Sequence, residues 1–247
     1  YKKVARKLSK EKEAEHFGNS MAMLSGDMAA AMANQIIFTS EFSSETIICA
    51  LNKLQEIVYT IVPGEMLDVV LEFRGQATEK EILKMYEGKT SSYSFEGPLH
   101  LGAILSGNKD EKIFKIYSRY AIPLGKAFQI RDDILGVFGD ERKLGKPIGS
   151  DISEGKQTLL IVKALECGNR KQKKIIKECL GKDNLKKWEL EEIRKIIRET
   201  GSLEYSQNIA EKFVLESLNA LSEINFKNRE ANKFFEGIAR YMVSRNV

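Results

Sequence analysis

Apolar residues recur at helical spacing along almost the whole chain, and this periodicity restricts the fold more than any other feature. No run of alternating apolar and polar residues, which would mark a β-strand, interrupts it. The 247 residues include only four prolines, so few positions force a helix to break. The pattern predicts an all-α protein. The expected helices cover residues 17–38, 44–74, 79–95, 110–136, 154–167, 170–179, 187–199, 202–222 and 228–243.

The connections between these helices are short, and no linker, low-complexity tract or internal repeat separates them. A chain of this length with 43% hydrophobic residues can build a sizeable core. We therefore expect one domain over residues 1–247. Residues 17–38 are rich in Ala, Gly, Ser and Met, which predicts a helix buried nearly all round. We expect Trp188 to anchor the core.

Composition excludes several classes of protein. The net charge is only +4, and both signs are mixed along most helices, which is typical of a solvated surface. No nucleic-acid-binding module accompanies the basic stretches, so we expect no nucleic-acid partner. Three separated cysteines and two histidines have no zinc-site spacing and indicate reduced thiols in a cytoplasmic protein. No apolar run approaches the roughly 20 residues of a membrane span.

Two adjacent acids stand in the segment FQIRDDILGVFGDERKLGKPIGSDISEGKQT, near the end of a predicted helix. Phe128 and Asp132 are four residues apart, as are Gln129 and Asp133, so the members of each pair share a helix face. Isoleucine and leucine side chains supply the opposing apolar stripe. The segment therefore predicts carboxylates that project from one side of a buried helix.

Three lysines, Lys143, Lys146 and Lys156, follow the two acids in a glycine-rich stretch. Mg²⁺ takes one or two protein carboxylates together with substrate phosphate oxygens, and lysines bind the remaining phosphate charge. Carboxylates and lysines in one place thus predict a site for a metal-bound polyphosphate. A lone lysine such as Lys89, farther upstream, is usually a surface residue. Lys89 gains importance only if it faces the acids.

A second acidic stripe lies in the predicted helix over residues 44–74. Glu65, Asp68 and Glu72 stand at positions i, i+3 and i+7, which is one face of a helix. The neighbouring side chains are strongly apolar. Two interpretations stay open: the stripe is a solvated face, or it faces a polar cavity.

Together these stretches resemble the trans-isoprenyl diphosphate synthase, or polyprenyl synthetase, family, especially its short-chain archaeal-type farnesyl and geranylgeranyl diphosphate synthases. The segment with the paired aspartates is similar to the family's second aspartate-rich motif and its lysine tail. PGEMLDVVLE is similar to the G-Q-x-x-D element, GKTSSYSF to the Lys-Thr element, and HFGNSMAMLSGDM to the start of the central helix. The order and spacing agree from about residue 15 to the end of the sequence.

The resemblance implies an antiparallel helical bundle around a central cavity, of the class I isoprenoid synthase type. It implies a prenyltransferase of lipid biosynthesis that condenses an allylic diphosphate with isopentenyl diphosphate. The product would be a short-chain all-trans prenyl diphosphate, geranylgeranyl or farnesyl, formed by Mg²⁺-assisted ionisation. A cytoplasmic homodimer with about three Mg²⁺ ions per site is implied as well, and only one set of the metal ligands would lie in these residues.

The resemblance also implies roles for single residues. The implied metal ligands are Asp132, directly, and Asp133, through metal-bound water. The implied substrate-binding residues are Lys89, Thr90, Phe128, Gln129, Lys146 and Lys156. The lysines would hold the allylic diphosphate, and Phe128 would form a wall near isopentenyl diphosphate. Four of these residues are implied to act in catalysis: Lys89, Thr90, Gln129 and Lys146.

The sequence departs from the family in one large respect. The first aspartate-rich motif, D-D-x-x-D, and the Gly-Gly-Lys-Arg element before it are absent from these residues. The chain is then a fragment that lacks the N-terminal helices, a record of ordered residues only, or a degenerate subunit. We favour missing residues. Glu65 also replaces the glutamine of the G-Q-x-x-D element, and Gly136 stands where many members have a third aspartate.

Three functions therefore stay open. The first is the chain-elongating prenyltransferase. The second is a class I terpene cyclase, against which the paired aspartates and the lysine tail argue. The third is a non-catalytic partner subunit of a heteromeric prenyl synthase, which the absent first motif keeps open.

Overall fold

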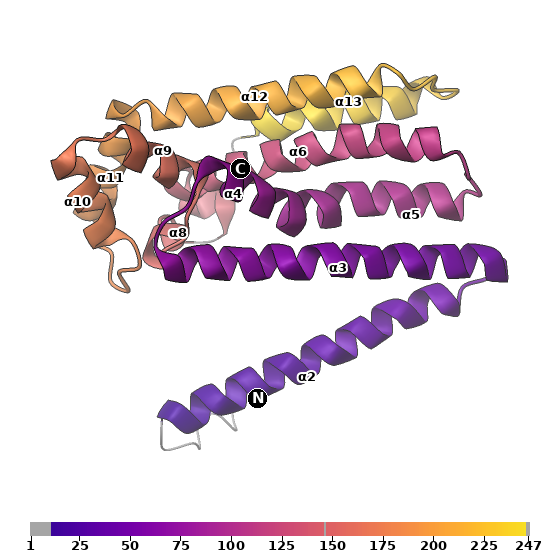
Figure 1. Ribbon diagram of the computed structural model, residues 1–247, viewed down its shortest axis with the longest axis horizontal. Helices are drawn as coiled ribbons and strands as arrows, with labels where there is room; N and C mark the ends of the chain where they lie inside the picture. The colour runs from indigo at the N-terminus through magenta and orange to yellow at the C-terminus, as the bar shows by residue number, and fades with distance from the viewer. Residues whose placement is uncertain (1–10, 146, 246–247) are drawn as a thin grey trace. The chain divides into compact units, whose positions relative to one another are not determined.

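The computed structural model describes residues 11–145 and 147–245. These residues form helices and turns and contain no strand, which confirms the predicted all-α fold (Figure 1). In chain order the helices are α2 (Glu11–Phe38), α3 (Ser44–Arg74), α4 (Glu79–Tyr86), the π-helix η1 (Glu87–Glu96), α5 (Gly97–Leu105), α6 (Glu111–Phe138), α7 (Glu141–Leu144), α8 (Ser150–Ser153), α9 (Leu159–Cys167), α10 (Arg170–Cys179), α11 (Lys187–Glu199), α12 (Ser202–Leu221) and α13 (Arg229–Ser244).

The chain divides into two compact units, residues 1–54 and 55–247, and α3 runs across the boundary. The described part of the first unit holds α2 and the start of α3. Met23 and Ile36 of α2 are 70% and 73% exposed, so the prediction that residues 17–38 are buried nearly all round is not met. Small residues and Met suit an exposed helix as well as a buried one. The single-domain organisation stays a prediction.

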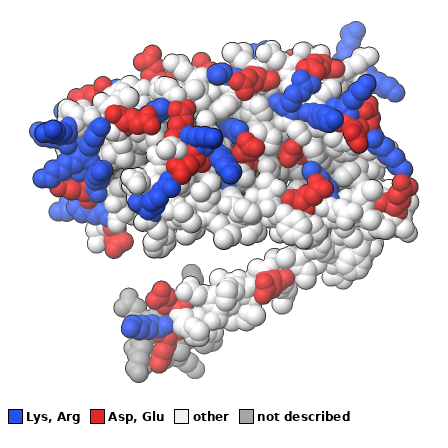
Figure 2. Space-filling model, in the orientation of Figure 1, with Lys and Arg blue, Asp and Glu red and all other residues white. Residues whose placement is uncertain are grey.

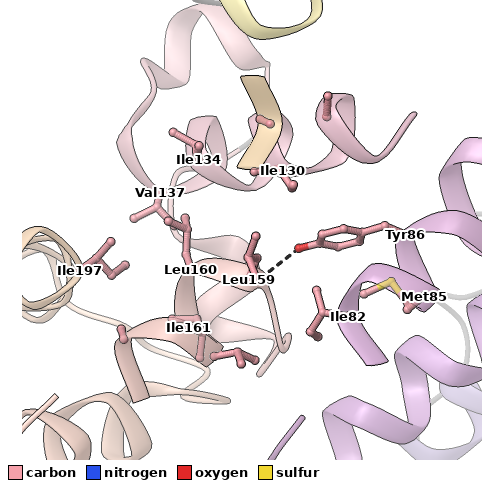
Figure 3. Close-up of a cluster of buried hydrophobic side chains, with 14 of the residues drawn as sticks. Ile82, Met85, Tyr86, Ile130, Ile134, Val137, Leu159, Leu160, Ile161 and Ile197 are labelled. Atoms are coloured by element: carbon pink, nitrogen blue, oxygen red, sulfur yellow. Dashed lines mark hydrogen bonds between the residues drawn. The ribbon is translucent and has the colours of Figure 1, made fainter. Parts of the chain in front are cut away.

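The core of the second unit is built around α6. This helix packs mainly against α12 and η1, and α12 also contacts α9 and α13 (Figure 1). Isoleucines and leucines of α4, α6 and α9 meet in the buried cluster of Figure 3. Each such side chain contributes about 1.5–3 kcal/mol when it is fully buried. This cluster holds in place the helices that carry the predicted site.

The predicted helix over residues 79–95 is not one α-helix. A capping box between Thr78 and Glu81 starts α4, and after Tyr86 the helix widens into η1. At two points neighbouring backbones touch η1. A Cβ atom on Gly64 of α3 would lie 2.5 Å from the Lys89 backbone nitrogen, and one on Gly125 of α6 would lie 2.4 Å from the Ser91 Cα. Glycine is needed at both contacts because any side chain would collide with backbone.

Helical periodicity missed the shorter helices. The sequence pattern predicted no helix over residues 97–105, where the structure has α5. Pro98 lies in the first turn of this helix, where a missing N–H costs nothing. The helices α7 and α8 are only four residues each, too short for a periodic signal. The prediction for Trp188 is wrong, because this side chain is 66% exposed. The buried face of α11 begins one position later, at Glu189.

The surface shows where charge is concentrated. Lys and Arg side chains gather over the end formed by α10 and α11, whereas the band along α3 is mostly uncharged (Figure 2). Exposed apolar side chains of α3 in the second unit include Tyr59, Met66 and Phe73. Among the described residues, none of the helices is long and apolar enough to cross a membrane.

Candidate functional site

A pocket of about 210 Å³ in the second unit collects acidic and basic side chains from α3, η1, α6, α8 and the loop after α8. The charged residues that line it are Asp68, Lys89, Asp132, Asp133, Asp151 and Lys156. Two lysines therefore face four carboxyl groups. The segments that supply them are far apart in sequence, and the buried cluster around α6 brings them together.

Lys89 lies on the η1 side of the pocket and contacts two carboxylates of α3. Its Nζ donates a hydrogen bond to Asp68 at 2.6 Å and lies 3.1 Å from a Glu65 oxygen. Burial opposes the charge of Lys89, but Asp68 and Glu65 outweigh it and raise the pKa of the ammonium above its usual value. Asp68 is buried, so the interpretation of the α3 stripe as facing a polar cavity is confirmed for this residue.

Lys156 also lines the pocket, from the loop that joins α8 to α9. Its Nζ is 2.7 Å from a Glu154 oxygen and 3.3 Å from an Asp151 oxygen. Burial again opposes the charge, and the two carboxylates again outweigh it and raise the pKa of Lys156. Both lysines are therefore cationic at neutral pH.

Asp133 lines the pocket but is almost fully buried. Its two carboxyl oxygens accept hydrogen bonds from the Tyr86 hydroxyl and, at 2.9 Å, from Gln129 Nε2. Burial raises the pKa of Asp133 to about 7. The Tyr86 hydroxyl in turn accepts a hydrogen bond from the Leu159 backbone N–H at 3.0 Å, the dashed line in Figure 3. Tyr86 thus joins α4, α6 and the start of α9.

Asp132 is the carboxyl group of the adjacent pair that opens onto the pocket, with a side chain 32% exposed. One of its oxygens lies 3.5 Å from a guanidinium nitrogen of Arg245. Gln129, which also lines the pocket, accepts a hydrogen bond from the Thr90 hydroxyl at 2.7 Å. Asp132 thus presents its carboxyl group to the pocket, while Asp133 and Thr90 hold Gln129 in position.

Phe128 lies outside the residues that line this pocket. Its ring centroid is 5.6 Å from that of Phe95, and the Arg245 guanidinium carbon lies 4.1 Å from its centre on a cation–π contact. Arg245 also donates to the Phe128 carbonyl at 3.3 Å. The ring is therefore fixed next to Asp132, and its role as a substrate wall stays a prediction.

The structure brings most of the sequence-predicted site residues together. Five of them line one pocket: Lys89, Gln129, Asp132, Asp133 and Lys156. Thr90 is hydrogen-bonded to Gln129. Lys146 lies outside the described residues, so its role stays a prediction.

Sequence reasoning missed four residues of the site. Asp151 had a signal, because it precedes Lys156 by five positions in the lysine tail. Glu154 was within the same segment. Tyr86 had none, since 47 residues separate it from Asp133. Arg245 had none either, because it reaches Asp132 only through the packing of α13 on α6.

The donor groups fit a Mg²⁺ ion that binds together with a phosphate-bearing ligand. No cluster of three or more His, Cys, Asp or Glu side chains in residues 11–145 and 147–245 is arranged to hold a metal by itself. Mg²⁺ characteristically takes one or two carboxylates and completes its shell with phosphate oxygens and water. Asp132 supplies such a carboxylate. The buried Oε1 of Gln157, on the pocket wall, has no hydrogen-bond partner in this part of the chain and can accept from a metal-bound water.

Comparison with known proteins gives a consistent result. The polyprenyl synthetase family model matches residues 9–197. A geranylgeranyl diphosphate synthase of Sulfolobus acidocaldarius is 35% identical over 231 residues, which cover 93% of this chain and 69% of that protein. One of Saccharolobus solfataricus is 36% identical with the same coverage.

Solved structures give the same answer. A Corynebacterium glutamicum geranylgeranyl pyrophosphate synthase, complexed with isoprenyl diphosphate and magnesium, has a TM-score of 0.90 at 29% identity and covers 98% of this chain and 67% of its own. The enzyme of Pyrococcus horikoshii has a TM-score of 0.81 at 30% identity. The all-helical fold is thus that of the isoprenoid synthases. The chain belongs to the polyprenyl synthetase family, which confirms the resemblance seen in the sequence.

Proposed function

We propose that this chain condenses an allylic diphosphate with isopentenyl diphosphate to give a short-chain all-trans prenyl diphosphate, geranylgeranyl or farnesyl. Family membership confirms the predicted class of enzyme, a trans-prenyltransferase. The observation that carries the proposal for this chain is the meeting of Asp132, Lys89 and Lys156 in one pocket. A terpene cyclase and a non-catalytic partner subunit are the alternatives.

The residues of the pocket suit the departure of a diphosphate. Breaking the allylic C–O bond leaves a carbocation and builds negative charge on the leaving group. Lys89 and Lys156, which both line the pocket, are placed to stabilise that charge. Gln129, held by Thr90 and Asp133, presents a fixed amide to the same space. No protein nucleophile is required.

Mg²⁺, when bound, would neutralise the diphosphate as charge develops on it. Asp132 would be its protein ligand in this chain. Asp133, with both oxygens occupied by Tyr86 and Gln129, would act by orienting Gln129 and by contact with metal-bound water.

The test is product formation by Asp132→Ala at saturating Mg²⁺. Loss of the carboxylate should lower turnover about a thousand-fold, because metal stabilisation of the leaving group is worth several kcal/mol. Asp183→Ala is the matched control, since Asp183 is exposed and does not line the pocket. Near-normal turnover in Asp132→Ala would reject the proposal. Inactivity of the unmodified chain that persists when diphosphate binding is normal would fit a non-catalytic partner subunit or a fragment that lacks the first aspartate-rich motif.

Other expectations remain proposals. The exposed apolar side chains of α3 suit a homodimer interface, which sedimentation velocity at micromolar concentration would test. A cytoplasmic location and the length of the product stay predictions as well. According to the family resemblance, side chains just before the first aspartate-rich motif largely set that length.

A further inference from the structure

The two lysines of the pocket are held by the same arrangement of acids. Each contacts one shielded aspartate and one exposed glutamate. For Lys89 the aspartate is Asp68, with a side chain 11% exposed, and the glutamate is Glu65, 49% exposed. For Lys156 the pair is Asp151 and Glu154, whose side chains are 13% and 53% exposed. The pattern is repeated although the four acids come from unrelated stretches of sequence.

Hydrogen-bond capacity gives this pattern a consequence. A lysine ammonium has three N–H donors. In each case two of them face carboxylates, so one donor is left for a ligand. A diphosphate that needs more than one contact, or the full charge of the ammonium, must therefore displace one of the two acids.

The glutamate is the acid that can leave. Glu65 and Glu154 are half exposed, so water can solvate them once they separate from the lysine. Asp68 and Asp151 line the pocket and are shielded, so separation would leave a poorly solvated charge. The inner aspartates therefore hold each lysine in place, and the outer glutamates compete with the incoming anion.

We propose that Glu65 and Glu154 are positioning residues that set the affinity of the site for diphosphate by competing for Lys89 and Lys156. The inference rests on the proposed diphosphate site. The inference gives a specific effect to Glu65, the residue that replaces the glutamine expected from the family motif. A second carboxylate on Lys89 weakens diphosphate binding relative to an amide at the same position.

The experiment measures the binding of inorganic diphosphate by calorimetry at saturating Mg²⁺, with the full chain. Glu65→Gln and Glu154→Gln keep an acceptor oxygen and remove one charge. Each should tighten binding about three-fold, the size expected from a half-exposed ion pair, and the gain should shrink at high salt. The matched control is Glu87→Gln. Glu87 is 48% exposed and contacts a different lysine, Lys126, at 2.5 Å. The Glu87→Gln substitution should leave diphosphate binding unchanged.

A double-mutant cycle separates competition for the lysine from a general change in charge. In a Lys89→Met background, Glu65→Gln should have no effect on affinity. Unchanged or weaker binding in Glu65→Gln and Glu154→Gln, or a gain that persists without Lys89, would overturn the inference. If Lys89→Met and Lys156→Met bind diphosphate as well as the unmodified chain, the proposed site itself fails. Far-ultraviolet circular dichroism checks that each variant is folded.

Discussion

The two sides of the pocket hold their lysines alike but are built differently. The helical wall is formed by α3 and η1 and carries Lys89. These two helices are in direct backbone contact at Gly64 and Gly88. The loop wall, residues 149–158, presents Lys156 from turns at Gly149 and Gly155, which have φ values of 83° and 81°. The two lysines therefore have comparable pairs of acids, although one lysine lies on a helix and the other on a series of tight turns.

This difference shows that the charge pattern is independent of the local backbone that carries it. Helical hydrogen bonds fix the first wall, whereas left-handed glycines and short helices fix the second. Tyr86, the residue directly before η1, links this wall to the end of the loop wall, because its hydroxyl accepts a hydrogen bond from the Leu159 amide. The same hydroxyl donates to Asp133 on α6. Substitutions that affect one wall and spare the other can test how far each determines the site.

The largest expected effect concerns Asp133 of α6, which is buried and belongs to neither wall. Its pKa is about 7 in the folded chain, because burial disfavours the charged form, against 3.8 for the ordinary group. Between about pH 4 and 7 the folded state keeps a proton that the unfolded state has released. Stability should therefore fall as pH rises through this window and level off above it. The full difference corresponds to about 4 kcal/mol.

Urea unfolding of the chain and of Asp133→Asn, in EDTA between pH 4 and 8, measures this effect. Asparagine at position 133 cannot ionise, so the contributions of the other titratable groups to the pH dependence cancel when the two proteins are compared. The stability of the unmodified chain relative to the variant should decline with rising pH. Parallel pH profiles for the two proteins would show that Asp133 is ionised in the folded state, and the link through Tyr86 would then be to a carboxylate.

Gly64→Ala should break the helical wall. The new Cβ would lie 2.5 Å from the Lys89 nitrogen and 2.6 Å from the Gly88 carbonyl carbon, and backbone cannot yield as a side chain does. We expect a loss of about 2–3 kcal/mol in the free energy of unfolding and weaker diphosphate binding as Lys89 is displaced. Thermal unfolding and calorimetry measure both. Gly102→Ala in α5, with no atom within 4 Å of its Cβ, is the control and should not destabilise.

Gly155→Ala should disturb the loop wall less. Its Cβ would meet Gly181 only at 3.4 Å, so the cost comes from the positive φ of 81°. We expect a loss of about 1 kcal/mol, measured by the same unfolding experiment. Gly155→Asn should lose less, since asparagine tolerates this conformation better. If Gly155→Ala destabilised the chain more than Gly64→Ala, the loop wall would be the more constrained of the two.

The sequence by itself determined the helical fold and much of the site. Helical periodicity is a local property, so α3, α6 and the helices from α10 to α13 were predicted to within about two residues. The helix predicted from residue 154 begins only at Leu159. The paired aspartates at 132 and 133 and the lysine tail were recognisable because their spacing in one segment carries the signal. The resemblance to the polyprenyl synthetases added Lys89 and Thr90, which spacing alone would have left on the surface.

Only the tertiary structure decided how the acids are used. Asp132 and Asp133 are neighbours in sequence, yet one opens onto the pocket and the other is buried against Tyr86. The pairing of Lys89 with Glu65 depends on two glycine backbones in contact, and that of Lys156 with Glu154 on a turn at Gly155. Burial and long-range contact set these roles, because the charge state and partners of a side chain depend on its surroundings in space, which periodicity does not encode.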